Sequence, residues 1–357
     1  NTVAGAISLI TKKPSDEFEG KVSADVGNRS YREVKGVVNI PLADNASAKF
    51  AVSKAVRDGY VDNIITGNKL GALDTLSYRA QFRVNPTDQL EINASFDGLH
   101  SDSLILVGTP ISDMLGNFPN TIATGAREVA FSADPYDKRD VSGSIFDVEY
   151  ETESGLTIKS ITGFRNTDAS YTNQTDYAPV DVISLDYTDK FSQFSQEVQL
   201  ISSDEGAFTY MLGLYYYNQD ADTRRDVIIG QDFYTAFFGP LYQSGALTPP
   251  LPPFPALPVT YAAALVGFGV PGDMVFNNGK VKTKSKAIYF NGAYDISEKA
   301  TFGFGGRYSI EDKDGLWLLD GTRSGIFFIG STNGLNDPTG PSPQAFKRQD
   351  QHFAPAA

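Results

Sequence analysis

The sequence predicts an all-β fold, namely an antiparallel up-and-down transmembrane β-barrel. Three observations carry this prediction. Apolar and polar residues alternate along many segments, these segments are long for strands, and the links between them are short and long in turn. The chain holds 357 residues, which suffices for one large all-β unit or for two ordinary domains.

Composition narrows the class of protein. Hydrophobic residues make up 41% of the chain, yet no apolar run reaches the about 18 residues that a membrane-spanning helix needs. Barrel strands need no such run, because their alternation averages out to modest hydropathy. The net charge of -13 argues against a nucleic-acid partner, and the lack of cysteine removes disulfides, thiolate metal ligands and thiol nucleophiles.

The alternation is clear in the segment from Leu76 to Asn85. One face would carry Leu76, Tyr78, Ala80, Phe82 and Val84, and the other Ser77, Arg79, Gln81, Arg83 and Asn85. Such a two-faced strand has two physical interpretations. A soluble sandwich buries the apolar face against a second sheet, whereas a membrane barrel turns it to lipid and keeps the polar face towards a wet lumen.

Strand lengths bear on this choice. Many segments exceed the about five or six residues of a typical soluble strand and match the about nine to eleven that a tilted strand needs to cross a bilayer. The predicted strands are Gly20–Asn28, Arg32–Leu42, Ser47–Arg57, Thr75–Asn85, Leu90–Gly98, Arg139–Thr152, Leu156–Tyr171, Phe191–Ser202, Phe208–Asp220, Lys284–Ile296, Thr301–Glu311 and a last one that begins near Gln351.

Connection lengths favour the barrel. Short polar links fall at Ala43–Ala46, Pro86–Gln89, Glu153–Gly155, Ser203–Gly206 and Ser297–Ala300. Long links fall at Asp58–Asp74, Leu99–Lys138, Thr172–Lys190, Ala221–Thr283 and Asp312–Asp350, and only the link near Gly27 departs from this order. In a meander, alternate links lie at the same end of the sheet. Outer-membrane barrels show this asymmetry, whereas a sandwich has no reason to keep it.

The number of strands predicts that the barrel is incomplete. The segments amount to about 11 complete strands and the start of another, whereas bacterial barrels normally have an even number. An unclosed sheet would leave backbone groups unpaired in lipid. We therefore expect the chain to contain about half of a barrel.

The opening residues, NTVAGAISLITKKP from Asn1 to Pro14, form a short apolar strand that two lysines and a proline end. This stretch resembles the last plug strand of TonB-dependent outer-membrane receptors, of the siderophore-receptor type. The matching residues are Gly5, Ala6, Ile7, Thr11, Lys12, Lys13 and Pro14, while Ser8 stands where asparagine is common. FSQEVQLIS from Phe194 and DQHFAPAA from Asp350 also resemble barrel strands of this family.

The resemblance implies a domain arrangement and a function. Residues 1–14 would be the end of the plug, and residues 15–357 the N-terminal half of a barrel of about 22 strands. The protein would import a scarce substrate, such as a ferric siderophore, across the bacterial outer membrane. Its partners would be that substrate, outer-membrane lipid and the TonB energy-transducing complex, whose contact region lies outside this chain.

Other functions stay open at this point. A corrinoid or a glycan could replace the siderophore. A passive porin-type channel would lack a plug strand, and a soluble β-sandwich binding module would pack its apolar faces against each other. An enzyme is not expected, because no catalytic motif is present and His100 and His352 lack metal-ligand spacing. We expect neither a cofactor nor a metal.

Substrate recognition is expected in the long links, since loops on a rigid scaffold carry function. The link from Ala221 to Thr283 combines arginines with aromatic side chains, which suits an anionic conjugated ligand. The candidate residues are Arg224, Arg225, Phe233, Tyr234, Phe237, Phe238 and Tyr242, together with Tyr171, Gln174 and Tyr177 near the top of a strand. These aromatics could instead pack the loop or form an interfacial girdle.

The polar faces of the strands supply a second set of inward residues. If the alternation is read correctly, Arg79, Arg83, Asp97, Asp147, Glu149 and Glu197 face the lumen. We expect most of them to hydrogen-bond to the plug or to neighbouring strands.

Overall fold

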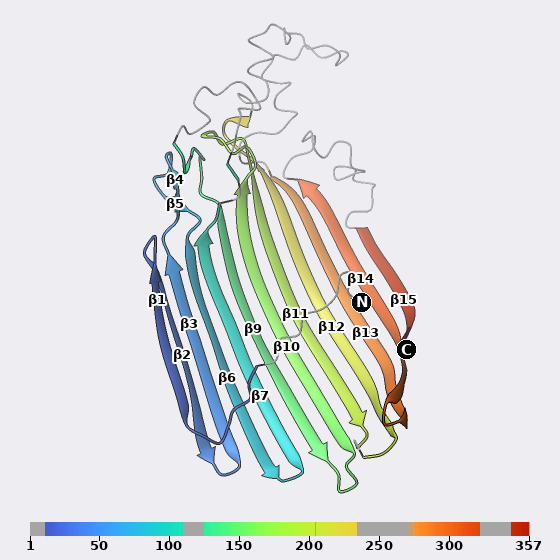
Figure 1. The fold of residues 1–357 in the computed structure, drawn as a ribbon. Coiled ribbons are helices and arrows are strands. Elements are labelled where there is room, and N and C mark those ends of the chain that lie inside the picture. The colour runs from blue at the N-terminus through green and yellow to red at the C-terminus, as the bar shows by residue number, and fades with distance from the viewer. Residues whose placement is uncertain are drawn as a thin grey trace.

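The computed structural model describes residues 11–106, 108–109, 125–203, 205–233, 272, 274–321 and 344–356. Within them the chain forms one antiparallel sheet of 12 strands and a separate sheet of 3 short strands (Figure 1). In the large sheet every strand pairs with the next strand of that sheet along the chain, so the predicted up-and-down order is confirmed.

The large sheet contains strands of 9 to 24 residues. They are β1 (Glu19–Gly27), β2 (Tyr31–Ala43), β3 (Ala46–Arg57), β6 (Leu73–Thr87), β7 (Leu90–Leu104), β9 (Tyr136–Glu151), β10 (Thr157–Gln174), β11 (Ile183–Ile201), β12 (Phe208–Ile229), β13 (Met274–Ser297), β14 (Ala300–Gly321) and β15 (Gln344–Ala356). All the predicted strands are present. The five predicted short polar links lie together at one end, and the short turn between β1 and β2 lies at the other end (Figure 1).

Several strands extend further towards the long connections than predicted. β12 continues to Ile229 and β13 begins at Met274, although the sequence predicts a long link from Ala221 to Thr283. β15 likewise begins at Gln344 instead of near Gln351. The charged residues in these extensions lie opposite each other on paired strands, where opposite charges stabilise pairing. Lys280 Nζ, for example, lies 3.1 Å from Asp222 Oδ2.

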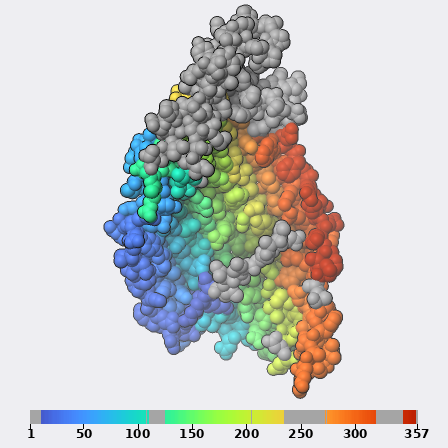
Figure 2. All heavy atoms as spheres, turned by 45° about the horizontal axis from the view of Figure 1, so that its top comes forward, coloured from blue at the N-terminus to red at the C-terminus, as the bar shows by residue number. Residues whose placement is uncertain are grey.

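The sheet has one polar face, which we call the inner face and define as the face that residues 11–16 contact. Ser15 N donates to Asn39 Oδ1 at 2.9 Å, Lys49 Nζ donates to the carbonyl of Lys12 at 3.2 Å, and Lys13 pairs with Glu91. In Figure 2 the blue and orange strands flank a hollow on this face. Residues 1–10, which include Gly5, Ala6 and Ile7, lie outside the described residues.

The predicted inward residues lie on the inner face and contact neighbouring strands. Asp97 Oδ2 lies 3.1 Å from Arg165 Nη2, and Asp97 Oδ1 lies 3.8 Å from Arg79 Nη2. Gly143 lies between Asp97 and Arg165 in the register, and a Cβ atom there would fall 2.8 Å from Arg165 Nη2. The absence of a side chain at Gly143 therefore allows the guanidinium to reach across the strand.

The opposite, outer face is apolar and uncovered. Its exposed side chains come from most strands of the sheet and include Val52, Tyr78, Phe96, Phe146, Phe164, Val198, Leu214, Ile288, Tyr308 and Phe353. Leu214 is 56% exposed and Phe353 64% exposed. A sandwich would bury such a face under a second sheet, and the described residues contain no such layer. The fold is therefore the predicted partial barrel, with β1 and β15 as its two edges.

Packed hydrophobic clusters occur beyond the strands, at the end with long connections. β4 (Val61–Asn63), β5 (Lys69–Leu70) and β8 (Glu128–Val129) form the small sheet. The buried cluster beneath it consists of Val61, Leu70, Val129 and Phe131. Asn63 links the small sheet to the segment that follows β8. Its amide donates to the carbonyl of Phe131 at 3.0 Å and to Asp134 Oδ1 at 2.8 Å. The sequence did not predict this small sheet.

Among the residues that the structure describes, no helix is long and apolar enough to cross a membrane.

Candidate functional site

An aromatic pair lies on the inner face near the long connections. Tyr171 on β10 and Tyr187 on β11 occupy directly opposite positions in the register. Their rings are stacked, with centroids 4.2 Å apart and planes inclined by 8°. The two strands thus hold their aromatic rings face to face as one stacked pair.

Arg225 on β12 continues this stack on the other side of Tyr187. Its guanidinium carbon lies 4.9 Å from the centre of the Tyr187 ring, within the range of a cation–π contact. Nη2 donates to Asp189 Oδ1 at 2.7 Å, and Nη1 donates to the carbonyls of Thr188 at 3.3 Å and Arg224 at 2.8 Å. These bonds fix the orientation of the guanidinium and engage three of its five N–H donors. Two donors are left without a partner among the described residues.

A second ion pair, on β9, borders the stacked tyrosines. Asp137 lies opposite Tyr171 in the register, and Arg139 holds its carboxylate with two hydrogen bonds of 2.7 and 2.5 Å. We call the set Tyr171, Tyr187, Arg225, Asp189, Arg139 and Asp137 the tyrosine–arginine cluster. It offers a stacking surface and oriented charged donors, which suit a planar or anionic ligand.

The structure brings two of the predicted site residues together, Tyr171 and Arg225. Tyr187 and Asp189 complete their cluster and were not predicted as site residues. Arg224 lies on the other face, where Nε donates to Asp226 Oδ2 at 2.6 Å and the guanidinium carbon lies 5.2 Å from the centre of the Phe276 ring. Both arginines belong to strand β12, whereas the sequence predicts them in a loop.

Three further predicted residues pack the bases of the long connections. Gln174 is 5% exposed, donates to Ser132 and accepts from Ala133 N at 3.3 Å. The ring of Tyr177 lies 5.8 Å from that of Phe131, and Phe233 is buried with Val182 and Ile229. Tyr234, Phe237, Phe238 and Tyr242 lie outside the described residues.

Asp176 organises the connection that leads into β11. Its carboxylate accepts the N–H groups of Ala178 at 3.1 Å, Val182 at 3.0 Å and Ile183 at 3.4 Å. Burial raises the pKa of Asp176, although these backbone hydrogen bonds act in the opposite direction. Because Ile183 begins β11, these bonds help to place the strand that carries Tyr187.

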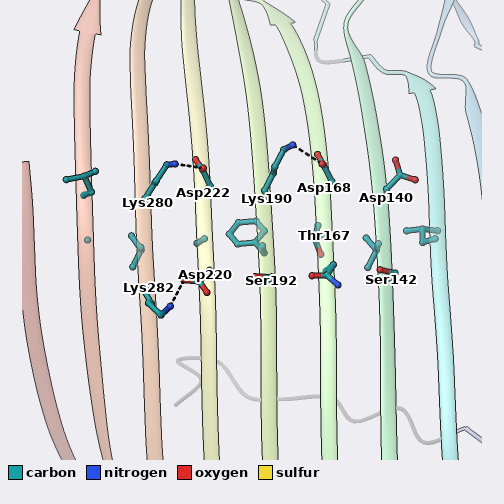
Figure 3. A pocket seen from close by; sticks show the side chains of 18 of the residues that line it. Asp140, Ser142, Thr167, Asp168, Lys190, Ser192, Asp220, Asp222, Lys280 and Lys282 are labelled. Atoms are coloured by element: carbon teal, nitrogen blue, oxygen red, sulfur yellow. Dashed lines mark ion pairs between the residues drawn. The ribbon is translucent and has the colours of Figure 1, made fainter. Parts of the chain in front are cut away.

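The outer face carries a groove of about 830 Å³ above the apolar residues (Figure 3). Ion pairs between adjacent strands cross it: Lys190–Asp168 at 3.2 Å, Lys280–Asp222 at 3.1 Å and Lys282–Asp220 at 3.3 Å (Figure 3). These lysines already have counter-charges, and the groove faces away from the tyrosine–arginine cluster. We therefore place the candidate ligand site on the inner face.

Metal-ligating side chains do not gather in the described part of the chain. No group of three or more His, Cys, Asp or Glu residues is arranged there to hold a metal ion. His100 Nδ1 lies 2.7 Å from Asp140 Oδ1 as an exposed pair on the outer face.

Solved structures share this fold. The ferric yersiniabactin uptake receptor FyuA from Yersinia pestis matches 97% of this chain and 44% of its own, with TM-score 0.67 and 16% identity. The siderophore receptor PiuA from Acinetobacter baumannii matches 97% and 47%, with TM-score 0.66 and 11% identity. The ferric-catecholate import receptor Fiu from E. coli K12 matches 98% and 49%, with TM-score 0.59 and 12% identity.

A scan against protein-family models finds no match. The chain spans about half the length of the receptors that it matches in structure. The low identities limit the likeness to the fold, and there it extends over almost the whole chain. In fold, the chain therefore resembles the siderophore and ferric-chelate receptors FyuA, PiuA and Fiu.

Proposed function

We propose that this chain forms part of an outer-membrane receptor that imports a ferric siderophore in a TonB-dependent manner. The observation that carries the proposal is the tyrosine–arginine cluster on the inner face, at the end of the sheet where the long connections lie. The fold of siderophore receptors supports the same substrate class.

The cluster has the chemistry for binding such a complex. Tyr187 is covered by Tyr171 on one side and by Arg225 on the other, so an anionic chelate with conjugated rings would stack on the far face of Tyr171. It could also accept hydrogen bonds from the two remaining donors of Arg225. Asp189 holds the guanidinium in place, so little side-chain freedom is lost on binding. Binding by preoriented groups suits a receptor for a scarce ligand.

The outer membrane is the proposed location. The exposed apolar side chains of the outer face would contact lipid, as the outward residues of a membrane barrel do. The polar inner face would line the lumen. Both features disfavour a soluble sandwich.

Residues 1–14 are proposed as the end of the plug and residues 15–357 as the N-terminal half of the barrel. The hydrogen bonds of residues 11–16 to β2 and β3 support this division, because they hold the segment against the lumen wall. Coupling to TonB would use a part of the receptor outside this chain.

Ligand binding by the complete receptor that contains this chain tests the proposed substrate class. The purified receptor in detergent is titrated with a ferric tris-catecholate, ferric citrate, a ferric trihydroxamate, cyanocobalamin and maltohexaose, with intrinsic fluorescence as the readout. We expect a micromolar or lower Kd for at least one ferric complex and no saturable binding of the last two. Binding of cyanocobalamin or maltohexaose alone would replace the siderophore by a corrinoid or a glycan.

A further inference from the structure

Three arginines lie close together beside strands β1, β2 and β3, at the end of the sheet with the long connections. They line a groove of about 860 Å³ together with Gly27, Asn28, Tyr31 and Leu73. Arg29 comes from the turn between β1 and β2, Arg57 from the end of β3, and Arg127 from the residues just before β8. We call this site the arginine groove.

The arginine groove opens on the inner face. Side chains alternate along β3, so Arg57 shares a face with Lys49, which contacts residue 12 of the N-terminal segment. Tyr31 shares a face with Glu33, whose carboxylate accepts from Ser53 on β3 at 3.2 Å. A ligand that enters the lumen could therefore contact these guanidinium groups.

The aromatic ring of Tyr60 contacts two of the three arginines. The guanidinium carbons of Arg29 and Arg57 lie 4.7 and 5.7 Å from the centre of the Tyr60 ring. Gly71 makes room for that ring, because a Cβ atom at this position would fall 2.2 Å from Tyr60 Cε1. The carbonyl of Gly71 also accepts a hydrogen bond of 3.0 Å from Arg57 Nη2. These contacts hold the guanidinium groups of Arg29 and Arg57 in place.

None of the three guanidinium groups has a counter-charge among the residues that the structure describes. Within the described residues, no carboxylate oxygen lies within 4.0 Å of any of them. Glu33 is engaged by Tyr31 and Lys35, and Glu128 accepts from Gly125 N at 3.1 Å. Nε of Arg57 is buried without an acceptor. Elsewhere on the sheet, arginines such as Arg83, Arg139 and Arg165 are paired with aspartates.

Backbone geometry also marks the arginine groove. Arg29, Ser30 and Arg127 have positive φ angles of 62°, 55° and 100°, which side-chain-bearing residues adopt only where the surroundings impose them. Backbone hydrogen bonds of 2.9 Å from Asp58 N to Arg29 O and from Asp62 N to Arg127 O hold two of these residues. The angles of Arg29 and Ser30 follow from the short β1–β2 hairpin turn, which needs left-handed residues. The convergent like charges are the feature that indicates a site for an anionic ligand.

We propose that the arginine groove binds the carboxylates of a polyanionic ferric chelate. The substrates of the receptor are then ferric chelates that carry several carboxylate groups. Guanidinium groups pair with carboxylates through two parallel hydrogen bonds, so three of them match a ligand with several carboxylates. This inference rests on the proposed import function and adds that the imported substrate is negatively charged.

Ferric citrate and a ferric trihydroxamate without net negative charge are the two probes. Binding to the complete receptor in detergent is measured for wild type and for R29Q/R127Q, which alters two exposed side chains and leaves the half-buried Arg57 intact. R32Q is the matched control, because Arg32 is an exposed arginine next to the groove whose side chain lies on the outer face. A titration at low and at high salt reports the charge dependence.

We expect R29Q/R127Q to weaken binding of ferric citrate at least tenfold and to reduce its salt dependence, while R32Q changes the Kd less than twofold. Unchanged ferric citrate binding by R29Q/R127Q would overturn the assignment. So would wild-type binding of the trihydroxamate alone, although the proposed import of a ferric siderophore would then stand. Wild type that binds no ferric complex at all would overturn both.

Discussion

Arg224 and Arg225 are neighbours on β12, yet their side chains serve opposite faces of the sheet. Arg224 pairs with Asp226 at 2.6 Å on the apolar outer face, and Arg225 pairs with Asp189 at 2.7 Å on the polar inner face. The period of two in a β-strand imposes this separation. A substitution of Arg224 is therefore a matched control for the same substitution of Arg225.

Replacement of Arg225 is expected to weaken ligand binding. R225Q removes the charge beside Tyr187 and the oriented donors, and hydrogen bonds to charged groups contribute about 1.5–3 kcal/mol. The Kd for a bound ferric complex should rise about tenfold or more. R224Q should leave the Kd within twofold of wild type, and equal losses in the two variants would contradict the placement of the site on the inner face.

Gly213 leaves room for the ring of Tyr289, and we expect this glycine to be needed for stability. Tyr289 donates to Glu197 across β12, and a Cβ atom at Gly213 would fall 2.0 Å from Tyr289 Cζ. G213V should displace the ring and lower the free energy of unfolding by about 1–3 kcal/mol. Thermal unfolding in detergent measures the effect, and G303V is the control because a Cβ atom at Gly303 has no neighbour within 4 Å. Similar melting temperatures for the two variants would refute this role.

Charge on the outer face is expected to impair membrane assembly. Ile288 is 47% exposed on that face, and an arginine on the lipid side of a barrel costs about 2–4 kcal/mol near the middle of the bilayer. I288R should reduce the amount of folded receptor in outer-membrane fractions, judged by heat-modifiable migration in gels. S285R, on the inner face of the same strand and opposite Glu311, should assemble normally. Normal assembly of I288R would argue against lipid contact.

The connection held by Asp176 is expected to depend on pH. Burial raises the pKa of this carboxyl group in the folded state, so its contribution to stability is complete below the unfolded pKa and is lost as the pH rises through the folded pKa. D176N keeps an oxygen acceptor and removes the charge. At pH 7 the amides of Val182 and Ile183 should exchange hydrogen more slowly in D176N than in wild type, and near pH 3 the difference should vanish. Faster exchange in D176N at pH 7 would contradict this sign.

The sequence predicts the sheet well where only one face is apolar. From Leu76 to Asn85 the alternation identifies both the strand and its faces. It does so less well for residues 221–229 and 274–283, where charges on both faces mask the pattern and ion pairs such as Lys280–Asp222 replace apolar contacts. β4, β5 and β8 have only two or three residues each, which is too short for any period to show.

The candidate site is harder to predict because it depends on register. Tyr171 and Arg225 are predicted from residue type, but their relation passes through Tyr187, which only the pairing of β10 with β11 and of β11 with β12 brings between them. The arginine groove shows the same limit more strongly. Arg29, Arg57 and Arg127 come from three distant segments. Arg29 lies in a short turn, whereas the sequence predicts ligand recognition in the long links.

Iron uptake in cells measures the proposed TonB-dependent import itself. The complete receptor is expressed in Gram-negative cells that lack other ferric-siderophore receptors, with and without a functional TonB, and uptake of the bound ferric complex is followed with radioactive iron. We predict energy-dependent accumulation only when TonB is present and a reduction of at least fivefold by R225Q but not by R224Q. Equal accumulation without TonB would contradict TonB-dependent import, and equal uptake by the two variants would contradict the placement of the ligand site on the inner face.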